Sequence, residues 1–186
     1  MSALLRTLAL GAALAAAVTG AGRRPVTIFD LSDAIGKHVP AITLAGSDGV
    51  AIPLDAMRGK PTYVFLFAGW CTPCQEEMPF VRRAYERYGD RVQFVGVDVL
   101  EDTAAARAAI ASAALPFPVA IYPIDQLDSV IAPTAQLQAG AKYRIPSDFL
   151  IDGDGIVRFA WHGLAIDDHD NPVDVLPGYL AKLGVQ

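Results

Sequence analysis

Uninterrupted apolar runs along the chain predict the strands of a central sheet. Two of them, residues 62–68 and 92–99, are rich in β-branched and aromatic side chains, which is typical of strands buried on both faces. Shorter apolar runs predict further strands, at residues 40–45, 50–54, 118–122, 147–151 and 156–160. Turn residues separate the first two and the last two of these short runs, so each of these pairs is predicted to form a β-hairpin.

Segments with helical periodicity alternate with the strands. A helix is predicted to begin near Thr72, and its apolar face is formed by residues three or four positions apart: Met78, Val81, Tyr85 and Tyr88. An alanine-rich segment that ends near Ala114 and a closing segment at residues 176–183 predict two more helices. Elements in this order predict an α/β sandwich, in which helices flank a mixed central sheet with an N-terminal β-hairpin.

Residues 1–22 have the layout of a secretory signal peptide. A single positive residue, Arg6, precedes an uncharged run rich in alanine and leucine. The run is slightly shorter than the roughly 17–25 residues of a membrane-spanning helix, so both a cleaved signal and an N-terminal membrane anchor remain open. We expect residues 23–186 to form one domain in the periplasm or another extracytoplasmic compartment, either free or attached to the membrane through the N-terminal segment.

Composition narrows the function classes. The chain has 186 residues, 53% of them hydrophobic, and a formal net charge of -5, which is typical of one domain with a sizeable core. The acidic balance, without a run of lysine or arginine, argues against a nucleic-acid partner. The chain has only 2 cysteines, which excludes a disulfide-rich scaffold and a zinc site made of cysteines alone.

Both cysteines lie in one motif, Trp70-Cys71-Thr72-Pro73-Cys74, between a predicted strand and a predicted helix. At a helix N-terminus, unpaired N–H groups and the helix dipole favour a thiolate, so Cys71 is the candidate nucleophile. Cys74 comes one helical turn later and can attack a mixed disulfide formed at Cys71. Thr72 and Pro73 fix the turn between them. The motif therefore predicts a redox-active disulfide that needs no other cofactor.

Two other uses of the cysteine pair are weaker. A zinc site needs further ligands, and the three histidines, His38, His162 and His169, show no ligand spacing to one another, so no metal is expected. A purely structural disulfide that closes so short a loop removes little entropy from the unfolded chain. Redox chemistry remains the preferred interpretation.

The cysteine motif also carries a family resemblance. Residues 70–79 match the WCxPCxxExP pattern of the TlpA/ResA-like thioredoxin-fold oxidoreductases, and residues 36–61 and 144–155 resemble that family's N-terminal hairpin and its cis-proline loop. The resemblance covers nearly all of the chain after about Val39. It implies a thioredoxin-like sandwich and a thiol–disulfide oxidoreductase.

Carried over residue by residue, the resemblance implies that Cys71 attacks and Cys74 resolves. Pro146 would be a cis-proline that faces the cysteines, with the Ile145 backbone available to an extended substrate. Trp70, Thr72 and Pro73 would join these two residues in contacting the substrate.

Glu77 matches the acidic position that this family places near the active site, where a carboxylate could exchange a proton with Cys74. Thioredoxin itself has a buried aspartate in the strand before its cysteines, and Phe65 occupies that position in this chain. Glu77 is therefore the candidate for the role of that aspartate.

The resemblance implies a reductant that acts on protein thiols and disulfides, with apocytochrome c as the first physiological candidate and an upstream redox partner of unknown identity. Residues 125–140 look longer and less regular than the family's usual helix, which leaves partner specificity open. Two alternatives are a copper-binding chaperone and a thiol peroxidase. Sco-type copper chaperones have three residues between their cysteines, and the peroxidase needs a threonine where Ala68 stands.

Overall fold

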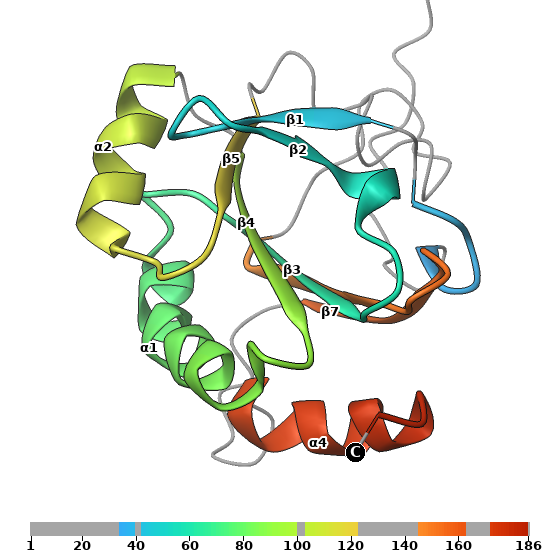
Figure 1. Cartoon of the computed structure of the whole chain (residues 1–186). Coiled ribbons are helices and arrows are strands. Elements are labelled where there is room, and N and C mark those ends of the chain that lie inside the picture. Colours follow the sequence, from blue (N-terminus) through green and yellow to red (C-terminus); the bar gives the residue numbers. More distant parts are fainter. Residues whose placement is uncertain (1–33, 40–41, 100–102, 123–144, 163–171, 186) are drawn as a thin grey trace, which may run out of the picture.

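A computed structural model describes residues 34–39, 42–99, 103–122, 145–162 and 172–185 of the chain (Figure 1). One mixed sheet runs through the described part in the order β2-β1-β5-β4-β3-β6-β7. Its strands are β1 (Thr43–Gly46), β2 (Ala51–Pro53), β3 (Thr62–Phe67), β4 (Gln93–Val99), β5 (Val119–Tyr122), β6 (Ser147–Ile151) and β7 (Val157–His162). The helices that the structure describes are α1 (Thr72–Tyr88), α2 (Thr103–Ala113) and α4 (Pro172–Lys182), besides the short 3-10 helix η2 (Leu54–Ala56).

These elements confirm the predicted α/β sandwich with a mixed sheet. Strand β3 pairs in parallel with β4 and antiparallel with β6, and β4 pairs in parallel with β5. The hairpins β1–β2 and β6–β7 are antiparallel. Gly49 and Gly155 have φ of 88° and 82° in the two connecting turns, a conformation that glycine adopts without steric cost.

Strand β3 lies inside the sheet between β4 and β6, and every residue in it is buried. Alternate side chains point to opposite faces, so Tyr63, Phe65 and Phe67 join one core and Val64 and Leu66 the other. The first core is covered by α1 and α4, which lie on the same side of the sheet (Figure 1). This face also holds both cysteines, so the chemistry of the molecule lies between α1 and the sheet.

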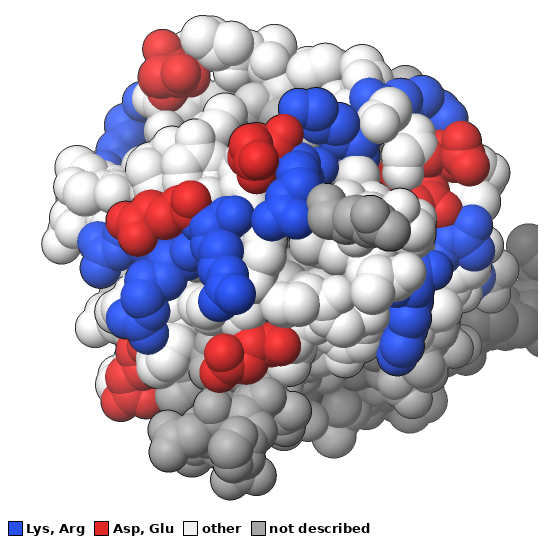
Figure 2. Space-filling view, turned by 60° about the horizontal axis from the view of Figure 1, so that its bottom comes forward, with Lys and Arg blue, Asp and Glu red and all other residues white. Residues whose placement is uncertain are grey.

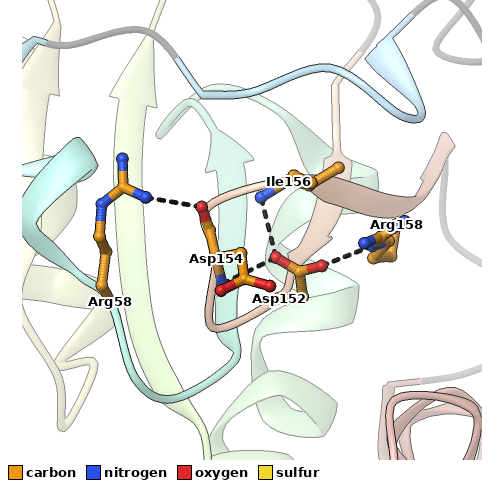
Figure 3. Close-up of polar contacts among 5 residues, drawn as sticks. All are labelled: Arg58, Asp152, Asp154, Ile156 and Arg158. Atoms are coloured by element: carbon orange, nitrogen blue, oxygen red, sulfur yellow. Dashed lines mark hydrogen bonds and ion pairs between the residues drawn. The ribbon is translucent and has the colours of Figure 1, made fainter.

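The β6–β7 turn is held together by one carboxylate (Figure 3). Asp152 accepts the backbone N–H groups of Asp154 and Ile156, both at 2.9 Å, and the Nε of Arg158 at 2.5 Å. Arg58 donates from Nη1 to the Asp154 carbonyl at 2.8 Å. Burial works to raise the pKa of Asp152, but these donors outweigh it and hold the pKa below its ordinary value.

The face that comes forward when the bottom of Figure 1 is turned up carries basic and acidic side chains next to one another (Figure 2). Helix α1 exposes Arg83, Glu86 and Arg87 within two turns. This face therefore offers no large patch of a single sign. No helix within the described residues is long and apolar enough to span a bilayer, and the predicted signal or anchor at residues 1–22 lies outside those residues, as does the segment at 125–140.

Candidate active site

The cysteine pair lies where β3 gives way to α1. The chain turns after Phe67, and the Cys71 N–H donates to the Ala68 carbonyl at 3.1 Å. Cys71 is the N-cap of α1 in extended conformation, and its Sγ accepts the backbone N–H of Cys74 at 3.2 Å. Cys71 and Cys74 are joined by a disulfide bond. In the reduced protein the same N–H and the helix dipole favour negative charge on Cys71.

The two sulfurs differ in access. Cys71 keeps 4% of its surface exposed and Cys74 none. Around Cys71, Thr72 and Pro73 are exposed, and Trp70 is 62% exposed despite its large apolar ring. A partner that approaches this end of the sheet therefore reaches Cys71 and its neighbours before Cys74.

The loop before β6 reaches the same end of the sheet. Leu66 of β3 pairs with Ser147, so Pro146 lies next to the end of β3 from which the cysteine motif departs. The Ile145–Pro146 peptide bond is cis, which confirms the bond geometry that the family resemblance implies. Ile145 is half-buried and packs against both cores.

Glu77 is buried although it carries a carboxyl group, with 1% of its surface exposed. It lies one turn after Cys74 on the buried face of α1, whereas the neighbouring Glu76 is exposed. Residues three apart on a helix are neighbours, so Glu77 and Cys74 lie side by side against the sheet.

Two further polar side chains meet Glu77 from the sheet. Asp148 is fully buried in β6, directly opposite Phe65 of β3, and Tyr63 donates its hydroxyl hydrogen to Asp148 Oδ1. Oδ2 of Asp148 and Oε2 of Glu77 are buried and have no hydrogen-bond donor among the described residues. The site therefore contains two buried carboxyl groups that share too few donors.

The electrostatics of this cluster favour protonated carboxyl groups. Burial, followed by the charge of Asp148 and a hydrogen bond to it, raises the pKa of Glu77 well above its ordinary value. Burial also raises the pKa of Asp148, against the opposing effect of hydrogen bonds from Tyr63 and Glu77. Because the two groups are coupled, they titrate as a pair. The pair therefore keeps a proton at pH values at which ordinary carboxyl groups are ionised.

Sequence reasoning found Glu77 but missed Asp148 and Tyr63. It treated Glu77 as the candidate for the role of thioredoxin's buried aspartate, whereas the structure brings Asp148 directly opposite Phe65, the position in question. A signal was available, because Asp148 is the one charged residue inside the apolar run 147–151. Within the described residues, no group of three or more His, Cys, Asp or Glu side chains is arranged to hold a metal ion.

The chain is similar to known thiol–disulfide oxidoreductases. Residues 34–172 match the family described as Redoxin. The thiol-disulfide oxidoreductase ResA of Bacillus thuringiensis (strain Al Hakam) is 30% identical over 150 residues, which cover 80% of this chain and 78% of the relative. ResA of Bacillus subtilis (strain 168) is 28% identical over 123 residues, which cover 66% of this chain and 64% of the relative.

Solved structures show the same fold. A crystal structure from Chlorobium tepidum, described as a thiol:disulfide interchange protein DsbE, superimposes with a TM-score of 0.66 at 26% identity, over 81% of this chain and 98% of that one. The thioredoxin domain of a thiol-disulfide oxidoreductase from Bacteroides vulgatus gives a TM-score of 0.63 at 19% identity, over 78% and 96% of the two chains. With its cysteine pair on the N-terminus of α1, the chain belongs to the Redoxin family, among the ResA-like thioredoxin-fold thiol–disulfide oxidoreductases.

Proposed function

We propose that this oxidoreductase is an exported reductant of protein disulfides, with the disulfide between the haem-site cysteines of apocytochrome c as its physiological substrate. The observation that carries the proposal is the Cys71–Cys74 pair, in which the more accessible sulfur caps a helix and the buried one follows a turn later. The relatives named thiol-disulfide oxidoreductase and thiol:disulfide interchange protein support the chemistry. Apocytochrome c is chosen because the cysteine motif resembles that of proteins that keep haem-site cysteines reduced.

In the proposed reaction the Cys71 thiolate attacks one sulfur of a substrate disulfide. A bond forms between Cys71 and that sulfur, and the other substrate sulfur leaves as a thiolate that takes up a proton. Cys74 then loses its proton and attacks Cys71, which releases the second substrate thiolate and leaves the Cys71–Cys74 disulfide. An upstream dithiol partner returns two electrons to the pair.

Neighbouring residues would hold the substrate during this exchange. An extended segment would pair with the backbone of Ile145, next to Pro146, as an added strand. The exposed ring of Trp70, together with Thr72 and Pro73, would contact the substrate on the other side of Cys71. Residues 1–22 would direct export and then be cleaved or remain as an anchor, so that residues 23–186 work outside the cytoplasm, where disulfides persist.

A turnover assay of protein disulfide reduction tests the chemistry. Cys71→Ser should reduce the rate to that of the uncatalysed exchange, because the attacking sulfur is gone. Cys74→Ser should accumulate mixed disulfides with the substrate, since nothing resolves them. Full activity in Cys71→Ser would contradict the proposal.

The reduction potential of the pair tests the direction. We expect a value closer to the roughly −270 mV of thioredoxin than to the roughly −120 mV of DsbA. A potential near the DsbA value would make the protein an oxidant. Fusion of residues 1–33 to a phosphatase that is active only outside the cytoplasm tests export, and an inactive fusion would contradict it.

A further inference from the structure

We propose that Asp148, held by Tyr63, is a positioning residue that keeps a single proton on Glu77 and thereby makes the Glu77–Asp148 pair the proton acceptor for Cys74 during resolution. This inference rests on the proposed function and adds two residues from the sheet to its proton chemistry.

The arrangement of the elements brings the three groups together under the cysteines. Asp148 lies opposite Phe65, and Tyr63 is two residues earlier on β3, so both side chains point to the face that α1 covers. Glu77 meets them from α1, one turn after the buried Cys74. Residues from three separate elements thus converge beside the sulfur that must lose a proton.

Hydrogen-bond accounting assigns one proton to the pair. If both carboxyl groups were ionised, Oδ2 of Asp148 and Oε2 of Glu77 would stay buried without a donor and two negative charges would lie side by side. If both were protonated, the hydroxyl of Tyr63 would donate to a neutral acid rather than to a charge. One proton on Glu77, donated to an ionised Asp148 that also accepts from Tyr63, satisfies all three groups.

No cationic side chain of the described residues stabilises a negative charge on the pair. The titratable and charged side chains on this face of the sheet and the helices packed against it are Cys71, Cys74, Tyr85 and Tyr88 from α1, Tyr63 from β3, the buried Asp98 from β4, and Tyr179 and Lys182 from α4, with Tyr179 stacked on Trp161 of β7. The shifts of Glu77 and Asp148 arise from burial, from each other and from Tyr63, with no cationic side chain of the described residues contributing. The proton state of the pair is therefore set locally.

The resolution step balances as follows. The Cys74 thiol transfers its proton to the singly protonated pair, which becomes neutral with two protons. The Cys74 thiolate attacks Cys71 Sγ and the bond between Cys71 and the substrate sulfur breaks. The substrate sulfur leaves with the electron pair and is protonated from solvent. The pair later returns its extra proton to solvent, and the net result is a reduced substrate and an oxidised Cys71–Cys74 pair.

A stopped-flow experiment isolates this step. The reduced full-length protein is mixed with dithiobis-nitrobenzoate, which releases one coloured thiolate when Cys71 attacks and a second when Cys74 resolves the mixed disulfide. The rate of the second release is measured from about pH 5 to pH 10, a range that contains the first ionisation of the pair, since the pKa of Asp148 is raised to about 7. In the parent protein we expect this rate to rise through an inflection set by the pair.

Both variants should move this inflection up, Asp148→Asn further than Tyr63→Phe. In Asp148→Asn the acceptor is Glu77 alone, whose pKa burial still raises, so Glu77 ionises at a higher pH than the first ionisation of the pair; the inflection moves up by about one pH unit or more and the second release slows roughly tenfold at pH 8. In Tyr63→Phe, Asp148 loses a donor that stabilises its charge, so the inflection moves up. The first release, at Cys71, should change less than twofold in both.

The matched control is Asp152→Asn, the same substitution just after the other end of β6. It should lower stability and leave the inflection in place. An unchanged inflection in both Asp148→Asn and Tyr63→Phe, with normal two-step release, would overturn the inference and leave the proposed function intact. Absence of a second release in the parent protein would instead contradict the proposed function. If Asp148→Asn does not fold, Tyr63→Phe decides.

Discussion

Asp148 in β6 and Asp152 just after this strand have pKa values that are shifted in opposite directions. Asp152, just after β6, accepts two backbone N–H groups and the Arg158 guanidinium, which hold its pKa below the ordinary value (Figure 3). Asp148, in the second position of β6, accepts the hydroxyl of Tyr63 and lies beside another carboxyl group, and burial raises its pKa. The number and charge of the donors, rather than burial alone, separate the two.

This difference shows that, within one fold, hydrogen-bond donors decide whether a buried carboxylate is structural or reactive. Asp152 is fully ionised and supplied with donors, so it fixes a turn and has no reason to exchange protons. Asp148 is supplied with too few donors, so its charge is costly and a proton nearby is easily gained or lost. The cysteine pair lies beside the second kind of carboxylate.

The largest expected effect concerns the pH dependence of stability. The pKa of Asp148 rises from 3.8 to about 7 on folding, because the folded protein favours the protonated carboxyl group. The stabilisation of the native state by this proton is complete below pH 3.8 and is lost as the pH rises through about 7. The shift corresponds to on the order of 4 kcal/mol. In the oxidised protein, the free energy of unfolding of Asp148→Asn should therefore gain on the parent by a similar amount between pH 4 and pH 8, measured by denaturant titration. A constant difference between the two proteins would contradict this.

The next effect is the loss of the structural carboxylate. Asp152→Ala removes the acceptor for two backbone N–H groups and the partner of Arg158, and it should lower the free energy of unfolding by about 2 to 3 kcal/mol at pH 7. The pKa of Asp152 is lowered by folding, so its contribution is present above its unfolded pKa and is lost as the pH falls through its folded pKa. Urea unfolding at pH 7 and at pH 2.5 should show a smaller difference from the parent at the acid pH. Disulfide-exchange turnover should stay within twofold of the parent.

A smaller effect is expected for the cation of this turn. The Arg158 side chain is 43% exposed, so solvent screens its ion pair with Asp152. Arg158→Ala should lower the free energy of unfolding by about 1 kcal/mol at pH 7, and by less when Asp152 has already been replaced by alanine. A double-mutant cycle measures this difference. Equal costs in both backgrounds would mean that the pair does not stabilise the turn.

The smallest effect is expected at Arg58, whose Nη1 donates to the exposed backbone carbonyl of Asp154. Arg58→Ala should change the free energy of unfolding by less than about 0.5 kcal/mol. A larger loss, seen in the same urea titration, would show that the turn depends on this long-range contact as much as on Asp152.

Much of the fold follows from local sequence patterns. The apolar runs at 62–68 and 92–99 are the two central strands, and the helix predicted to begin at Thr72 does so. Residues that are apolar on both sides of a strand can only lie inside the sheet, and this is why the pattern is sufficient there. The cysteine motif was equally local, because its strand, turn and helix are consecutive.

The carboxyl cluster could not be predicted in the same way. Tyr63, Glu77 and Asp148 lie on three elements, and their meeting depends on the register of β6 against β3 and on the rotation of α1 over both. The sequence shows that Glu77 follows Cys74 by three residues, but both a buried and a solvated glutamate fit that spacing. Long-range pairing between strands decided which carboxyl groups lie together.

Titration of the side-chain carboxyl carbons by NMR in the oxidised protein tests the central claim most directly. Asp148→Asn, Glu77→Gln and Asp152→Asn identify the three resonances. We predict that Asp152 is ionised at a pH below the ordinary aspartate value, while the resonances of Asp148 and Glu77 shift together at pH values well above it. Titration of Asp148 at or below 3.8, or independently of Glu77, would contradict the account.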